Sequence, residues 1–128
     1  MLRIFLKAFG LGWLLPAPFT TIAAKEVHDL MQTEPLLLID VRRPDEWQRT
    51  GMAMDSQGIT SSNDTFIEEV SKIADQDKSK QIALICHAGS RSQDAALKLS
   101  DNGFKNIISV DGGMQAWSAA DLPVSPYA

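Results

Sequence analysis

Residues 81–103 read QIALICHAGSRSQDAALKLSDNG and decide the fold. The run from Gln81 to Cys86 is almost wholly apolar, which predicts a strand buried on both faces of a sheet. A short loop containing Gly89 follows, and Ser90 to Asn102 then predicts a helix that Gly103 ends. A buried strand, a short loop and a helix in this order form the repeating unit of a mostly parallel sheet.

The rest of the chain repeats this alternation from residue 20 onward. Apolar runs predict further strands at 36–41, 58–60 and 106–110, and helical periodicity predicts helices at 24–32, 44–51, 66–74 and 114–120. A chain of 128 residues suffices for one ordinary domain with its own core. We therefore expect a single α/β domain.

The amino-acid composition argues against several classes of function. The chain is 45% hydrophobic and 22% charged, which is typical of a folded protein. Twelve basic and sixteen acidic residues give a formal charge of −4, and no basic cluster compensates locally, so we expect no nucleic-acid partner. The single cysteine, Cys86, excludes an internal disulfide, and with only His28 and His87 beside it a closed zinc site lacks ligands.

The first 19 residues form a separate hydrophobic segment. Arg3 and Lys7 precede an apolar stretch from Ala8 to Leu15, as in a secretory signal, but no clean cleavage site follows. The stretch is too short to span a membrane. Two interpretations stay open: export or membrane association through residues 1–19, or an arm that packs on the domain. Exported and cytoplasmic locations are accordingly both open.

The loop after Cys86 carries the chemistry that we expect. Small residues and a glycine before a helix allow several backbone N–H groups to point at one spot and bind an anion. These donors, together with Arg91, would stabilise a thiolate on Cys86 and make it a nucleophile at neutral pH. Ser90 and Gln93 fit a capping box for the helix. Arg42, Arg43 and His87 are expected to lie at the same edge of the sheet, where they would add positive charge to the pocket.

Each of these residues also has an ordinary structural interpretation. Cys86 could be an inert buried thiol. His87 could be a solvated surface residue, and Arg42 and Arg43 could belong to a solvated run of charges. The glycine-containing turn between strand and helix, with an arginine five residues after the cysteine, favours the reactive interpretation of Cys86.

Residues 20–125 resemble a single rhodanese domain. The resemblance rests on Leu38-Ile39-Asp40-Val41-Arg42 with Pro44-Asp45-Glu46-Trp47, on the loop from Cys86 to Arg91, on Asn102-Gly103-Phe104, and on Gly112-Gly113-Met114-Gln115-Ala116-Trp117 with Leu122-Pro123-Val124. It implies five mostly parallel strands with helices on both faces. It also implies a persulfide on Cys86, transferred sulfur held by the backbone of His87, Ala88, Gly89, Ser90 and Arg91, and Arg91 bracing the loop and steering an anionic donor.

Two positions depart from the pattern of that family. Arg43 stands where an acidic residue is usual, and Met52 stands where a histidine is common. Related phosphatases and arsenate reductases have a loop one residue longer, whereas only four residues separate Cys86 from Arg91 here. The shorter loop favours a single sulfur atom over a tetrahedral oxyanion.

The resemblance therefore implies a thiosulfate:cyanide sulfurtransferase-like enzyme. We expect thiosulfate or a protein persulfide as sulfur donor, a thiol as acceptor, no metal or organic cofactor, and a monomer. Two alternatives stay open: a non-catalytic interaction module, because fold does not guarantee activity, and a phosphatase-like or arsenate-reductase-like oxyanion enzyme.

Overall fold

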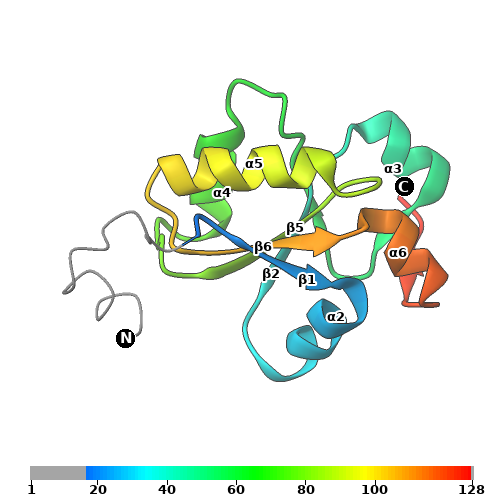
Figure 1. Ribbon diagram of the computed structural model, residues 1–128. Helices are drawn as coiled ribbons and strands as arrows, with labels where there is room; N and C mark the ends of the chain where they lie inside the picture. The colour runs from blue at the N-terminus through cyan, green and yellow to red at the C-terminus, as the bar shows by residue number, and fades with distance from the viewer. Residues whose placement is uncertain (1–16, 128) are drawn as a thin grey trace.

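A five-stranded sheet forms the centre of the molecule (Figure 1). The computed structural model describes residues 17–127. The strands follow the order β1-β6-β5-β2-β4, and every neighbouring pair is parallel. Their bounds are β1 (Thr20–Ala23), β2 (Leu37–Asp40), β4 (Gln57–Gly58), β5 (Gln81–Ile85) and β6 (Asn106–Asp111). The predicted α/β class and the five-stranded parallel sheet are confirmed.

Helices cover both faces of this sheet, and Figure 1 shows α4 and α5 on one side with α2 and α6 on the other. Their bounds are α2 (Ala24–Thr33), α4 (Phe66–Ile73), α5 (Ser90–Asp101) and α6 (Gly113–Ala119), and α3 (Pro44–Thr50) connects β2 to the short strand β3 (Met52–Ala53). Alternate residues of β5 belong to two hydrophobic cores, one on each face of the sheet. Ile82 and Leu84 belong to the core that contains Leu99 of α5. Ala83 and Ile85 belong to the core that contains Trp117 of α6. This alternation follows from the two-residue period of a strand. Cys86 continues the first series and lies on the α5 side of the sheet.

Some elements differ from the prediction. The edge strand β1 was not predicted, and the strand expected at 58–60 is a pair of residues, Gln57 and Gly58. A small antiparallel pair was also missed, in which Met52 of β3 lies opposite Ser125 of β7 (Val124–Ser125). Strands of two to four residues are too short to show a clear period in sequence. Met52 is buried, so it occupies the position of the missing histidine as a core residue.

Residues 1–16 of the hydrophobic N-terminal segment lie outside the residues that the structure describes. Whether residues 1–19 direct export, associate with a membrane or pack as an arm therefore stays a prediction. Among residues 17–127, no helix has the length and apolar character needed to cross a bilayer.

Candidate active site

Cys86 directly follows β5 and is held in place by the start of α6. Its carbonyl oxygen accepts a hydrogen bond from the N–H of Met114 at 2.7 Å, and that of His87 accepts one from Gln115 at 3.0 Å. Gly113 makes this approach feasible, because a Cβ there would lie only 2.7 Å from the carbonyl carbon of His87. Figure 1 shows the loop between β5 and α5 beside the start of α6. The conformation of the loop is thus set by a segment more than twenty residues away.

The loop offers backbone donors to the sulfur. Gly89 has a φ of 115°, a conformation that glycine adopts without steric cost, and its N–H donates to the Sγ of Cys86 at 3.0 Å. Within residues 17–127, no protein acceptor meets the N–H groups of His87, Ala88 or Ser90. The start of α5 adds the positive end of a helix dipole. An atom with negative charge bound in this loop would find several unused donors.

The capping box expected from Ser90 and Gln93 is absent. Gly89 is the N-cap of α5, no side chain caps it, and Ser90 is exposed. Instead Ser92 is fully buried, and its hydroxyl donates to the carbonyl oxygen of Gly89 at 3.0 Å. The left-handed conformation of Gly89 turns the chain so that Ser92, three residues later, and not Ser90, reaches back into the loop.

Two buried hydroxyls lie beneath the cysteine. The thiol of Cys86 donates to the Oγ of Ser92 over 3.6 Å, and the Oγ atoms of Ser92 and Ser109 are 2.7 Å apart. Sequence reasoning missed both serines. The available signal was Ser109 itself, the single hydroxyl within the otherwise apolar run Ile107 to Val110. A polar residue fully buried in a strand requires a partner.

Arg91 is bound to a carboxylate that the sequence analysis did not select. Its Nη1 and Nη2 donate to the two oxygens of Glu46 at 2.6 Å and 2.8 Å, a bidentate pair that joins α5 to α3. The hydrogen bond from Arg91 lowers the pKa of Glu46 to about 2, and that with Glu46 raises the pKa of Arg91. The signal in the sequence was the acidic residue at 46 in the stretch Pro44-Asp45-Glu46-Trp47. Arg91 braces the loop from outside, by tying the first turn of α5 to α3.

Arg42 does not rim the pocket, which corrects the prediction that it binds substrate. It is 1% exposed, and its Nε and Nη2 donate to the carboxylate of Asp40 at 3.0 Å and 2.8 Å. Its Nη1 donates to Thr50 and its Nη2 also donates to the carbonyl oxygen of Gly51, both at 2.9 Å. A guanidinium with these partners is a structural cross-link between β2 and the end of α3.

The other charges expected at the pocket are also placed differently. Arg43 is exposed and pairs with Asp45 at 3.1 Å, while His87 is exposed with its Nε2 at 3.3 Å from the amide nitrogen of Gln115. The arginines at 42, 43 and 91 thus each face a carboxylate. Within residues 17–127, the predicted gathering of unpaired positive charge is therefore not formed, and the sulfur accepts from the backbone N–H of Gly89 at 3.0 Å.

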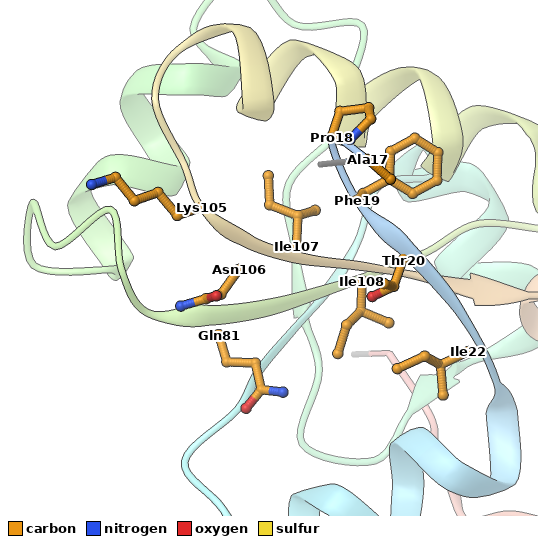
Figure 2. Close-up of a pocket in the computed structure, with 10 residues that line it drawn as sticks. All are labelled: Ala17, Pro18, Phe19, Thr20, Ile22, Gln81, Lys105, Asn106, Ile107 and Ile108. Carbon is orange, nitrogen blue, oxygen red and sulfur yellow. The ribbon is translucent and has the colours of Figure 1, made fainter. Parts of the chain in front are cut away.

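Two of the surface cavities lie at opposite ends of the sheet. One of about 410 Å³ lies at the amino ends of the strands, at the end of the sheet opposite to Cys86 (Figure 2); its lining includes Phe19, Thr20, Gln81, Asn106 and Ile108. A second, of about 310 Å³, lies at the carboxyl end and is lined by Val41, Arg43, Thr60, Ser61, Ser62, Arg91, Asp94 and Lys98. Ligands of open parallel sheets bind at the carboxyl ends of strands, the end that this second cavity shares with Cys86. Its lining includes Arg91 but neither Cys86 nor residues 87–90.

The chain is similar to known proteins in sequence and in fold. A profile of the rhodanese-like domain matches residues 23–120. The thiosulfate sulfurtransferase GlpE of Pseudoalteromonas translucida is 28% identical over 102 residues, which cover 80% of this chain and 91% of the relative.

Solved structures agree in fold. A polysulfide-sulfur transferase homodimer from Wolinella succinogenes superposes with a TM-score of 0.70 at 26% identity, covering 99% of this chain and 88% of that one. A protein from Rhodopseudomonas palustris, described as a possible tyrosine phosphatase, gives a TM-score of 0.73 at 25% identity, with 84% and 85% covered. The similar proteins thus include some named for sulfur transfer and one of unknown function described as a possible tyrosine phosphatase.

Proposed function

The chain belongs to the family of rhodanese-like domains, and we propose that it is a sulfurtransferase that carries a sulfur atom on Cys86. The observation that supports this most is the loop, in which the sulfur of Cys86 accepts one backbone N–H. Three further N–H groups beside it have no acceptor among the described residues. Relatives named thiosulfate sulfurtransferase match most of the chain and support the same assignment. A sulfur atom bonded to Cys86 and carrying negative charge would use the donors that Cys86 leaves free.

The first half-reaction loads sulfur onto the protein. The thiolate of Cys86 attacks the outer sulfur of thiosulfate, a bond forms between Sγ and that sulfur, and the sulfur–sulfur bond of thiosulfate breaks. Sulfite leaves with the electron pair, so the products are a Cys86 persulfide anion and sulfite. The donors of the loop stabilise the terminal sulfur, which now carries the negative charge. A protein persulfide would load Cys86 in the same way, with a thiolate as leaving group.

The second half-reaction discharges the sulfur. An acceptor thiolate, or cyanide in an assay, attacks the terminal sulfur of the persulfide, and the bond between that sulfur and Sγ breaks. The electron pair returns to Sγ, which regenerates the Cys86 thiolate and releases a new persulfide or thiocyanate. Charge and atoms balance in both steps without a metal or organic cofactor. This is a two-step covalent relay.

Arg91 has a positioning role in this proposal. Its bidentate pair with Glu46 holds the first turn of α5, and with it Ser90 and the N–H groups that follow Gly89. Its side chain remains about one-third exposed and lines the cavity of about 310 Å³. Among the described residues that line this cavity, Arg43 is paired with Asp45, whereas Lys98 has no carboxylate partner and donates to the carbonyl oxygen of Ser61. The charge of Lys98 favours an anionic donor.

Intact-mass measurement tests the proposal directly. The reduced full-length protein incubated with thiosulfate should gain one sulfur atom, and cyanide should then remove it and yield one thiocyanate per protein. Cys86→Ser should neither gain the sulfur nor form thiocyanate, while Ser100→Ala, a change on the same helix away from the loop, should behave as the unaltered protein.

Three outcomes would overturn it. One is thiocyanate formation by Cys86→Ser at the rate of the unaltered protein. A second is hydrolysis of an aryl phosphate that depends on Cys86 while neither thiosulfate nor glutathione persulfide loads sulfur, which would support the phosphatase class. The third is a Cys86 that neither loads sulfur nor reacts with iodoacetamide faster than free cysteine, which would support an interaction module.

The expected monomer is part of the same proposal. The relative from Wolinella succinogenes is described as a homodimer, so the matter is open to direct measurement. Light scattering of the full chain should give the mass of one subunit, and a mass of two subunits would replace the monomer with a dimer.

A further inference from the structure

The mechanism above makes no use of the two buried hydroxyls beneath Cys86. Ser92 is 0% exposed and Ser109 is 1% exposed, and they come from different elements, α5 and β6. Within residues 17–127, the hydroxyl of Ser109 has a single side-chain partner, the hydroxyl of Ser92. An apolar residue would fill this core position in β6 without a hydrogen-bond partner. Because a buried hydroxyl needs such a partner, the serine at this position indicates a functional role.

Counting protons shows which way the hydrogen bonds run. Ser92 has one hydroxyl proton, and it points to the carbonyl oxygen of Gly89 at 3.0 Å. While Ser92 donates to Gly89, the contact of 2.7 Å between the two serines uses the proton of Ser109. The thiol proton of Cys86 also points to Ser92. With a neutral thiol, the oxygen of Ser92 accepts twice and donates once, which satisfies a hydroxyl completely.

We propose that Ser92 and Ser109 form a two-state hydroxyl relay that serves the thiolate of Cys86. When Cys86 loses its proton, Ser92 no longer receives a hydrogen bond from it, and the hydroxyl of Ser92 rotates from Gly89 to donate to Sγ. Ser109 donates to Ser92 in both states and fixes the oxygen within reach of the sulfur. Hydrogen bonds to a charged acceptor are about twice as strong as neutral ones, which favours the rotation. Ser92 is then a catalytic residue and Ser109 a positioning residue.

This inference rests on the proposed function for its consequence in turnover. In discharge, the bond between Sγ and the terminal sulfur breaks and the electron pair returns to Sγ, so Cys86 is the leaving group. A donor that stabilises the thiolate speeds that step. In loading, the same thiolate is the nucleophile, and a donor to it gives no such gain. Loss of the relay should therefore slow discharge more than loading.

Several other charged or titratable groups lie on the loop or at the carboxyl end of the sheet. They are Arg91 on α5, Glu46 on α3, Asp40 at the end of β2, Arg42 two residues beyond it, His87 in the loop and Asp111 at the end of β6. Substitution of either serine leaves all of them in place. Differences in pH dependence between serine variants therefore report on the hydroxyls.

The rate of Cys86 alkylation by iodoacetamide across pH tests the relay without any need for sulfur transfer. Ser92→Ala should raise the midpoint pH of alkylation by about one unit, equal to about tenfold less thiolate below the midpoint. Ser109→Val should raise it by about half a unit. Ser109→Thr, which has the same shape as valine but keeps a hydroxyl, should stay closer to the unaltered protein.

A double variant separates the relay from a general packing defect. If Ser109 acts through Ser92, then Ser109→Val should cause no further shift once Ser92 is alanine. Additive shifts, or equal midpoints for Ser109→Val and Ser109→Thr, would overturn the proposal, as would an unchanged midpoint in Ser92→Ala. Ser100→Ala serves as the control that should not shift. A shifted midpoint in a protein that loads no sulfur would keep the relay and reject only the sulfurtransferase function.

Discussion

Two connections leave the carboxyl end of the same sheet, from β2 to α3 and from β5 to α5, and they differ in what they do with their polar groups. In the first, Arg42 is enclosed and bound to Asp40, Thr50 and the carbonyl oxygen of Gly51. In the second, the left-handed Gly89 directs one N–H at Cys86, and neighbouring N–H groups have no acceptor in the part of the chain that the structure describes. Both connections lie at the same edge of the sheet, so this position alone does not create a binding site. The difference is that the second connection has backbone donors available to a ligand.

The largest effect is expected from a substitution in the connection from β2 to α3. Asp40→Ala leaves the guanidinium of Arg42 buried without its carboxylate, and the free energy of unfolding should fall by about 3–5 kcal/mol. Urea denaturation measures it, with Asp29→Ala as control because Asp29 is exposed in its pair with Lys25. The double change Asp40→Leu with Arg42→Met should recover most of the loss; equal stability of Asp40→Ala and the unaltered protein would contradict the structural role of the pair.

An intermediate effect is expected where the two connections meet, at Glu46 and Arg91. Glu46→Gln should lower the free energy of unfolding by about 1 kcal/mol, because Arg91 stays partly in water. The rate of sulfur transfer should fall more steeply, since the first turn of α5 loses its brace. Comparison of thiocyanate formation with urea denaturation distinguishes the two effects. A variant with unchanged kinetics would remove Arg91 from the proposed machinery.

The same pair has a pH signature. The pKa of Glu46 is held at about 2 in the folded protein, below its ordinary value, so its contribution is complete above the unfolded pKa and is lost as pH falls through the folded pKa. The stability difference between the unaltered protein and Glu46→Gln should thus shrink as pH is lowered from about 5 towards about 2. Denaturation curves along this range measure it, and a constant difference would show that Glu46 is not ion-paired.

The smallest effect is expected from the exposed charge between the two connections. Arg43 pairs with Asp45, and both side chains are more than half exposed. Arg43→Ala should change the free energy of unfolding by less than about 1 kcal/mol, as is typical of surface ion pairs. Thiocyanate formation should also change little at saturating thiosulfate. A large rise in the thiosulfate concentration needed for half-maximal rate would instead assign Arg43 to donor binding.

Much of the fold was predictable because its signals are local. The apolar run that ends at Cys86, the glycine in the loop and the helix up to Asp101 each reveal themselves within a few residues. The edge strand β1 and the pair of β3 and β7 were not predictable in this way, because strands of two to four residues depend on their neighbours for stability. The predicted capping box of Ser90 and Gln93 is absent because the conformation of Gly89 determines which serine bonds to the loop backbone, and this serine is Ser92.

By itself, the sequence determined the α/β class, the resemblance to rhodanese domains and the position of Cys86 in a loop between a buried strand and a helix. The tertiary structure decided the partners of the charged and hydroxyl groups: Glu46 for Arg91, Asp40 for Arg42, and Ser109 for Ser92. Glu46 and Arg91 are 45 positions apart, and Ser92 and Ser109 are 17 apart. Such pairs form only once the strand order β1-β6-β5-β2-β4 brings distant segments together, and that order depends on packing across the whole sheet, which no single strand encodes.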